Sequence, residues 1–402
     1  MIKNRDIIVI SLQAWDIDIG SQCKDIATEF SRSNRVLYVN SPLDRMTILR
    51  GRKDPKVKKR MEILRGRADD LIPVKENLWT LYPRTVLESI GRIPWKGLFD
   101  LGNRINNRRF ARQILSAADR LGFTDFILFN DNNVYRGLHL KEMLSPRLSV
   151  YYDRDNLLAM DFWKRHAPRV EADLMRRSDL VLANSDFFTR RALQYNPKSF
   201  NVGSGCDITL YERGEHLDTP ADIASIPRPI IGYMGALITL RLDLSILLRI
   251  AREHPEWNLV LIGPEDETFR SSELHRMKNV FFLGGKRPEE LPAYLKSFDV
   301  AINPQIVNEV TIGNYPRKID EYLSLGKPVV ATRTELMAEF DGSVYLANYA
   351  EEYPQLIRRA MAENSPDREE ERRKVARSHS WENNIAGIYR RMHDRMEELH
   401  AG

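Results

Sequence analysis

The chain has 402 residues, of which 43% are hydrophobic and 29% charged, and its formal net charge is +5. This length allows two domains with separate cores, and no apolar run approaches the ~18 residues of a transmembrane helix. Residues 1–16 lack the apolar stretch and cleavage site of a signal peptide. The two cysteines, Cys23 and Cys206, argue against a disulfide framework, and no Cys/His cluster has metal-ligand spacing. We therefore expect a protein of the reducing cytoplasm.

Strands alternate with helices in the first half. The pattern predicts strands at 6–11, 35–40, 77–84, 125–131, 147–155 and 178–186, and helices at about 21–32 and 103–121. Such alternation is typical of a parallel, doubly wound α/β sheet.

The segment 45–67 is strongly basic, with ten Lys or Arg residues against two acids. One interpretation is a solvated loop and helix face. The other is contact with an anionic membrane surface, where each basic residue contributes about 1 kcal/mol. The nearby apolar side chains of Met46, Ile48, Leu49, Ile63 and Leu64 would then insert shallowly. Nucleic acid is not expected, because no aromatic platform or base-reading motif accompanies the charge.

Polar residues follow three of the predicted strands. They stand at 130–131, 153–155 and 184–185, and ligands of doubly wound sheets bind beyond the carboxyl ends of strands. Asp16, Asn132, Asp153 and Asp155 are therefore candidates on this side of a site. The loop from Asp16 to Gln22 feeds the first helix, where Gly20 and Ser21 would offer backbone N–H groups, although Ser21 also fits a plain N-cap.

The second half repeats the pattern after a polar, Pro-containing segment at 212–229. Strands are predicted at 229–237, 257–263, 279–285, 299–305, 328–332 and 344–348, with helices at about 242–252, 288–298, 316–324, 350–364 and 380–399. We expect domains at 1–210 and 228–375 and a terminal helical segment at 376–402.

The segment "NYPRKIDEYLSLGKPVVATRTE", 314–335, predicts a helix that starts near Pro316 and stops at Gly326. Lys318 and Glu321 share one face, whereas Ile319, Tyr322 and Leu323 share the face toward the sheet. A cation in the first turn opposes the helix dipole, but it fits a bound phosphate there. The alternative is a surface ion pair worth less than about 1 kcal/mol.

"PRKIDEYLSLGKPVVAT" resembles the nucleotide-sugar-binding helix of GT-B glycosyltransferases of family 4, and specifically a TuaH-like bacterial subgroup of surface-polysaccharide synthesis. "SDLVLANSDFFTRRAL", "VGSGCDITLY", "IIGYMGAL" and "NVFFLGGKRPEELPAYLKSFDVAINP" resemble further elements of that family in the same order. The resemblance implies two Rossmann-like domains facing a central cleft, with a C-terminal helix that returns to the N-terminal domain.

The resemblance also implies functional residues. Arg241 and Lys318 would stabilise the leaving diphosphate, Glu321 would bind the ribose, and Asp131 and Asn132 occupy the neighbourhood of a sugar-contacting His. The expected donor-binding set is Gly20, Gly235, Gly284, Gly285, Lys286, Thr311, Asn314, Tyr315, Lys318 and Glu321; the expected catalytic set is Arg241, Lys318 and Asp131. Two positions depart from the family pattern, since Gly313 replaces the first Glu of its E-x7-E motif and Ala236 replaces an Arg.

The resemblance implies a retaining transfer from a nucleotide sugar to a glycan, lipid-linked or small-molecule acceptor. Cations at the diphosphate make a metal unnecessary, and the "DRD" at 153–155 falls in the acceptor-side domain, so neither metal nor cofactor is expected. One alternative is a nucleotide-sugar-binding protein without transferase activity. A second is a Rossmann-type oxidoreductase, although "GYMGAL" lacks the third Gly of the dinucleotide fingerprint.

Overall fold

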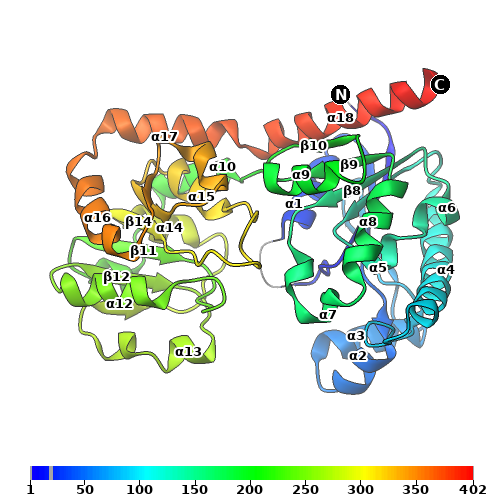
Figure 1. Cartoon of the computed structure of the whole chain (residues 1–402), viewed down its shortest axis with the longest axis horizontal. Helices are drawn as coiled ribbons and strands as arrows, with labels where there is room; N and C mark the ends of the chain where they lie inside the picture. The colour runs from blue at the N-terminus through cyan, green and yellow to red at the C-terminus, as the bar shows by residue number, and fades with distance from the viewer. Residues whose placement is uncertain (1, 18–20, 402) are drawn as a thin grey trace. The chain divides into compact units, whose positions relative to one another are not determined.

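The computed structural model describes residues 2–17 and 21–401, which divide into two compact units. Unit 1 comprises Met1–Gly203 and Asn384–Gly402, and unit 2 comprises Ser204–Asn383. Each unit is built on its own sheet flanked by helices (Figure 1). The alternation of strands and helices predicted from the sequence is therefore confirmed in both halves.

The main sheet of unit 1 has, over the described residues, eight strands in the order β10-β9-β8-β7-β1-β2-β5-β4. Neighbours run parallel except β4 and β5, which pair antiparallel at one edge. A short parallel pair, β3 with β6, lies outside this sheet. The strands are β1 (Asp6–Ser11), β2 (Arg35–Val39), β3 (Leu43–Asp44), β4 (Leu71–Lys75), β5 (Leu78–Leu81), β6 (Val86–Leu87), β7 (Ile127–Asp131), β8 (Leu148–Asp153), β9 (Leu180–Ala183) and β10 (Ser199–Asn201).

Helices cover both faces of this sheet. They are α1 (Gln22–Phe30), α2 (Arg45–Arg50), α3 (Pro55–Leu64), α4 (Lys96–Leu121), α5 (Val134–Gly137), α6 (Leu140–Leu144), η1 (Leu157–Ala159), α7 (Asp161–Lys164), α8 (Ala167–Arg177), α9 (Asp186–Leu193) and most of α18 (Trp381–Ala401). On one face Phe110 and Ile114 of α4 join Ile8 and Leu128 in a buried cluster. On the other face Phe30 of α1 contacts the Phe129 and Tyr389 rings.

The helix α4 starts earlier than the sequence indicates. It begins at Lys96, whereas the sequence predicts a start near Asn103. Gly97 and Gly102 lower the intrinsic helix propensity of this turn, which hides the true start. Among the residues before Asn103, the side chains of Leu98 and Leu101 face solvent.

The sheet of unit 2 has, over the described residues, six parallel strands in the order β13-β12-β11-β14-β15-β16. The strands are β11 (Ile230–Met234), β12 (Asn258–Ile262), β13 (Val280–Phe282), β14 (Val300–Asn303), β15 (Val329–Thr332) and β16 (Tyr345–Ala347). Its helices are α10 (Ile208–Arg213), η2 (Gly214–His216), α11 (Ala221–Ala224), α12 (Leu244–Glu253), α13 (Glu267–Arg270), η3 (Glu273–Arg276), α14 (Leu291–Lys296), α15 (Arg317–Ser324), η4 (Leu336–Phe340), η5 (Ala350–Glu352), α16 (Tyr353–Ala362) and α17 (Pro366–Ser378).

The sheet of unit 2 has a buried apolar cluster on each face, and α15, the helix of the sequence motif, packs in one of them. Ile319, Tyr322 and Leu323 of α15 are fully buried in one core cluster, as the helical spacing predicts. Ile223 and Ile226, from the segment 212–229, belong to the same cluster. Leu247 of α12 and Ile357 of α16 belong to the cluster on the opposite face of the sheet. In the part of the chain that the structure describes, no helix is both long and apolar enough to cross a membrane.

Candidate functional site

The side chain of Lys318 lies against the end of the first strand of unit 2. After β11 the chain turns at Gly235, whose φ of 137° is a conformation that favours glycine. A Cβ at this position would collide with Lys318 Cε and lie 2.8 Å from Lys318 Nζ. The ammonium group also lies 5.6 Å from the centre of the Tyr233 ring. The Lys318 side chain therefore occupies space that is free only because Gly235 has no side chain.

Lys318 is the second residue of α15, between two residues whose N–H groups are engaged. Arg317 donates to the Tyr315 carbonyl over 3.0 Å and Ile319 donates to the Pro316 carbonyl over 2.8 Å. Pro316, at the N-cap, makes no side-chain cap hydrogen bond. Among the described residues Lys318 forms no salt bridge, so the surface ion pair considered from the sequence is not formed. A lysine without a salt bridge at a helix N-terminus, where the helix dipole favours negative charge, is suited to an anion.

Glu321 lies one turn further along α15 and is partly exposed. The hydroxyl of Tyr211, on α10, donates a hydrogen bond to its carboxylate. Burial raises the pKa of Glu321, whereas the nearby charges of Arg317 and Lys318 lower it. Tyr211 is 4% exposed, so it holds Glu321 from inside the unit. The structure thus identifies Tyr211 as a hydrogen-bond partner that holds Glu321, which the sequence did not predict.

The loop that carries Arg241 is joined to the loop that carries Thr311. The Ile306 N–H donates to the Arg241 carbonyl over 2.9 Å, and Asn308 Nδ2 donates to the Leu240 carbonyl over 2.9 Å. The Thr311 hydroxyl is buried and donates to the Ile306 carbonyl over 2.5 Å. The guanidinium of Arg241 is exposed. Backbone hydrogen bonds therefore fix the loop, while the charged group remains accessible.

Asn314 and Tyr315 lie at the approach to α15. Asn314 Nδ2 donates to the Val310 carbonyl, whereas its Oδ1 is buried with no hydrogen bond within the described ranges. Tyr315 Oη lies 3.1 Å from Nδ1 of His379, which lies 2.8 Å from Asp320 Oδ1. Burial opposes charge on His379, but its hydrogen bond to Asp320 raises its pKa. Tyr315 is thus part of a hydrogen-bonded support behind α15.

Gly284, Gly285 and Lys286 form the exposed loop after β13. Gly284 has a φ of 69°. The side chain of Lys286 is not free, because its ammonium lies 2.7 Å from Asp222 Oδ2. Tyr294 also donates to Asp222, and the three groups tie this loop to α11. Backbone groups of the two glycines remain the available part of this candidate set.

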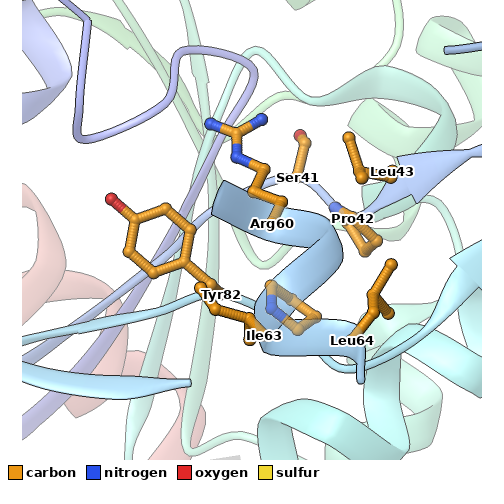
Figure 2. Close-up of a pocket in the computed structure, with 8 residues that line it drawn as sticks. Ser41, Pro42, Leu43, Arg60, Ile63, Leu64 and Tyr82 are labelled. Atoms are coloured by element: carbon orange, nitrogen blue, oxygen red, sulfur yellow. The ribbon is translucent and has the colours of Figure 1, made fainter. Parts of the chain in front are cut away.

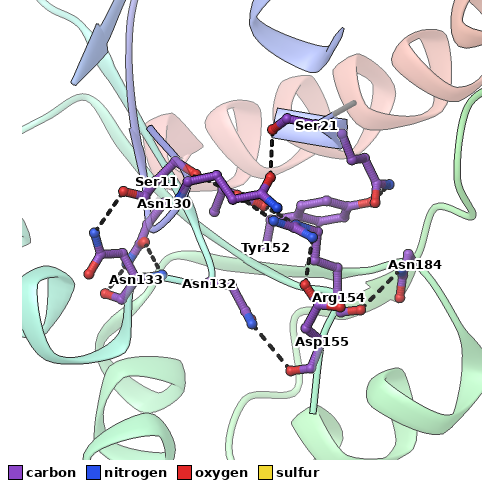
Figure 3. A network of polar contacts seen from close by, with 12 residues as sticks. Ser11, Ser21, Asn130, Asn132, Asn133, Tyr152, Arg154, Asp155 and Asn184 are labelled. Carbon is purple, nitrogen blue, oxygen red and sulfur yellow. Dashed lines mark hydrogen bonds and ion pairs between the residues drawn. The ribbon is translucent and has the colours of Figure 1, made fainter. Parts of the chain in front are cut away.

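In unit 1 the polar strand exits form a buried network (Figure 3). Both oxygens of Asp131 accept hydrogen bonds from Arg154, at 2.6 and 3.1 Å, and Ser11 donates to one of them over 2.9 Å. Asp131 has no exposed surface. A bidentate arginine–carboxylate pair of this kind is rigid, so Asp131 is placed to position Arg154 rather than to touch a ligand.

Asp153 shares Arg191 with Glu171. Arg191 donates to both oxygens of Asp153, at 2.8 and 2.6 Å, and lies 3.4 Å from Glu171, which accepts from Tyr151 over 2.7 Å. Burial raises the pKa of Asp153 to about 7; Arg191 opposes this shift and Glu171 adds to it. Two buried carboxylates beside one arginine therefore favour holding one proton between them.

The remaining candidates of unit 1 have distinct surroundings. Asn132 is buried in a left-handed conformation with φ 53°, and its amide donates to the Asp155 carbonyl over 3.2 Å. Asp155 is partly exposed and pairs with Arg154 at 2.5 Å. Asp16, after β1, pairs with Arg60 of the basic segment at 3.0 Å. Gly20 lies outside the described residues.

The basic segment 45–67 folds into α2 and α3, capped by Asp44 and Asp54. Figure 2 shows residues that line a small pocket beside α3, among them Arg60, Ile63, Tyr82 and Pro42. Ile63 is 1% exposed, so the expectation that it inserts into a membrane is wrong. Met46 and Leu49 are 38% and 54% exposed and remain available. Ile63 is buried because α3 packs this face against the body of unit 1.

A second hollow of about 330 Å³ lies between α2 and α3. Its lining combines apolar side chains with a charged rim; the residues are Ile48, Arg52, Val57, Lys58, Met61, Glu62 and Arg65. Among the described residues, no group of three or more His, Cys, Asp or Glu side chains is arranged to hold a metal ion. Asp153 and Asp155 of the "DRD" sequence are engaged by two different arginines.

Residues 228–363 match a family described as "Glycosyl transferases group 1". A curated relative from Bacillus subtilis (strain 168), the "Putative teichuronic acid biosynthesis glycosyltransferase TuaH", is 24% identical over 242 residues. That match covers 57% of this chain and only 60% of the relative.

Solved structures resemble the whole chain. Anabaena Alr3699/HepE, in complex with UDP, has a TM-score of 0.66 at 16% identity and covers 99% of this chain and 100% of its own. Sucrose-phosphate synthase from Thermosynechococcus elongatus has a TM-score of 0.66 at 15% identity, covering 97% of this chain and 100% of its own. The chain therefore has the GT-B fold, and residues 228–363 are similar to the glycosyl transferases group 1 family. The resemblance inferred from the sequence is confirmed.

The proton held near Asp153 gives stability a pH dependence. Because the native pKa is about 7 and the ordinary value 3.8, the native chain binds a proton that the unfolded chain has lost between these values. The free energy of unfolding should therefore fall as pH rises through that window, by up to about 1.4 kcal/mol per pH unit from this group. Asp153→Asn should flatten the slope, measured by hydrogen exchange of the β8 amides in the full chain. Asp119→Asn, which changes an exposed carboxylate on α4, is the matched control and should keep the wild-type slope. An unchanged slope in Asp153→Asn would contradict the assignment.

Proposed function

We propose that the chain is a glycosyltransferase that binds a nucleotide-sugar donor on unit 2 and transfers its sugar. The observation that carries this proposal is the position of Lys318, which lies against Gly235 at the start of α15 with no salt bridge among the described residues. A nucleotide sugar brings a diphosphate, and such a cation at the positive end of the helix dipole matches its charge. Neighbouring structures of the same fold are described as complexes with UDP and UDP-glucose, which supports a uridine diphosphate donor.

The transfer would depend on charge that develops at the leaving group. As the bond between sugar and diphosphate breaks, negative charge accumulates on the phosphate oxygens. Lys318 and the exposed guanidinium of Arg241 would stabilise it, and fixed positions would make that stabilisation available without reorganisation. Glu321, held by Tyr211, would accept hydrogen bonds from the ribose hydroxyls. Two cations supply the charge that a metal otherwise supplies, so we propose a metal-independent, retaining transfer.

An alternative is a nucleotide-sugar-binding protein of the same fold without transfer. Gly313 stands where an acidic residue is usual, and Asp131 is enclosed by Arg154 and Ser11. Product formation from a radiolabelled nucleotide sugar separates the two proposals. A thermal-shift comparison of UDP-, GDP-, dTDP- and CDP-linked sugars identifies the base.

The acceptor we propose is a glycan or lipid-linked glycan of bacterial surface-polysaccharide synthesis. The curated relative is named for teichuronic acid biosynthesis, which supports this class. An enzyme that uses a lipid-linked acceptor works at the membrane face, so we propose a cytoplasmic protein that binds the inner membrane peripherally. The exposed charges of the basic segment 45–67 would contribute electrostatic attraction.

Lys318→Ala should lower kcat/KM by about tenfold or more, because a charge-assisted contact with the diphosphate contributes about 1.5–3 kcal/mol. Glu321→Ala should weaken nucleotide affinity, measured by calorimetry. Lys278→Ala, which removes an exposed cation of the same unit, is the matched control and should behave as wild type. Near-normal kinetics and affinity in both site variants would leave α15 without a role in donor binding.

Gly235→Ala tests the place of Lys318 without altering its charge. The added Cβ would displace the lysine and strain a backbone with φ 137°, so UDP affinity should fall by about tenfold. Gly387→Ala is the control, because a Cβ there meets no atom within 4 Å. Wild-type affinity in Gly235→Ala would show that Lys318 does not need this position.

Exposed cations of the basic segment should drive salt-sensitive binding to anionic vesicles. Arg50, Arg52, Lys53 and Lys58 are exposed, whereas Arg60 is engaged by Asp16 and is left intact. Replacing these four by Ser should weaken binding about 100-fold or more, since each contributes about 1 kcal/mol. The same change of charge at Arg276, Lys278, Arg333 and Arg358 of unit 2 is the control. Equal loss in the two variants would assign the attraction to net charge alone.

A further inference from the structure

In the N-terminal half of α4, polar amide side chains lie on the buried face and several apolar side chains lie on the exposed face. Its inner face buries Asn103, Asn106 and Asn107 beside Phe99. Asn106 exchanges two hydrogen bonds with the backbone of Glu88, both at 2.9 Å. Asn107 donates to the Tyr135 carbonyl over 2.9 Å and accepts from the His139 N–H over 3.0 Å. These amides replace the apolar contacts that a surface helix normally makes with a core.

The outer face of the same turns is apolar. Trp95 is 69% exposed, Leu98 49%, Leu101 59% and Ile105 40%. They follow one another at spacings of three, three and four residues, which places them along one stripe of the helix. We call this set the α4 stripe. Scattered exposed apolar residues are ordinary, but four in one stripe above a polar inner face are not.

A second apolar pair adjoins the start of α4. Met160, between η1 and α7, is 51% exposed, and Phe162 of α7 is 52% exposed. The ring of Phe162 covers Gly91, because a Cβ there would lie 2.6 Å from Phe162 Cζ. Arg165 donates to the Arg92 carbonyl over 2.9 Å, which fixes this segment beside the residues that lead into α4. The apolar surface therefore extends beyond a single helix.

Positive charge surrounds the stripe. Residues 92–112 contain six Lys or Arg residues and one acid, Asp100. Asp100 is ion-paired with Arg169 at 2.6 Å. Five of these cations are exposed and form no salt bridge within the described residues: Arg92, Lys96, Arg104, Arg108 and Arg112. An apolar stripe with Trp at its end and cations beside it is the composition of a helix that lies in the interface of an anionic bilayer.

We propose that the α4 stripe is the membrane anchor of unit 1. Trp95, Leu98, Leu101 and Ile105 would lie among the acyl chains at the boundary of the head groups, and the flanking cations would contact anionic lipid. Burial of apolar area makes this contact persist at high salt, in contrast to attraction through the segment 45–67. The inference concerns lipid contact alone and stands without the proposed transferase activity.

The test measures binding of the full chain to vesicles of phosphatidylglycerol, with and without 0.5 M salt, and no donor present. A variant with Leu98→Gln, Leu101→Gln and Ile105→Gln should bind at least about tenfold more weakly than the wild type at both salt concentrations. Leu193→Gln is the matched control, because Leu193 lies on α9 with the same 49% exposure as Leu98. Both variants change exposed helix positions, and equal thermal unfolding temperatures would confirm that folding is intact.

Trp95 gives a direct readout of insertion. Vesicles with brominated acyl chains should quench part of the tryptophan fluorescence, and Trp95→Phe should remove that part. Wild-type binding by the triple variant, or quenching unaffected by Trp95→Phe, would overturn the proposal. A wild-type dimer that the triple variant converts to a monomer would also overturn it and assign the stripe to a second copy of the chain. Donor binding is measured separately by thermal shift, so failure of the proposed function is distinguishable from failure of this inference.

Discussion

The close approach of Lys318 to Gly235 is the constraint on which the donor side of the molecule depends. A lysine in the first turn of a helix opposes the local dipole, and Lys318 forms no salt bridge with any described carboxylate. The position is retained because the apolar face of α15 is fully buried, which fixes the rotation of the helix. Because Gly235 has no Cβ, the Lys318 ammonium group can reach the end of β11. Core packing thus holds a positive charge at the start of α15, beside the end of β11.

The two sheets use charge at their strand ends in different ways. In unit 1 the carboxylates of Asp131 and Asp153 each receive a bidentate arginine, so their charges are largely neutralised within the protein. Buried pairs of this kind gain little net stability but define a unique arrangement. In unit 2 the cations Lys318 and Arg241 lack such partners among the described residues. The sheet that lacks internal compensation is the one suited to hold an anion.

The sequence predicted most strands, the faces of α15 and its end at Gly326, because each depends on local pattern. It did not predict the edge strands β4 and β10 or the short pair of β3 and β6. Residues distant in sequence determined what it could not predict. Arg154 meets Asp131 only because β7 and β8 pair with Asp131 opposite Tyr152. Tyr211 reaches Glu321 through the packing of α10 on α15, and spacing alone gives no sign of it. The order of elements was readable, but the partners of buried polar groups required the register of the sheet.

The start of α4 was missed for a related reason. Hydrophobic periodicity normally marks the inner face of a helix, and residues 95–107 follow the opposite rule. The asparagines are inside because Glu88 and Tyr135 present backbone groups that need partners there. Burying an amide without a partner costs about 1–3 kcal/mol, so these contacts fix the rotation of the helix as firmly as a core would. Once they do, Leu98, Leu101 and Ile105 are left on the outer face, whereas Phe99 lies inside. Their exposure is therefore a consequence of satisfied polar groups within, and an environment less polar than water would stabilise this face.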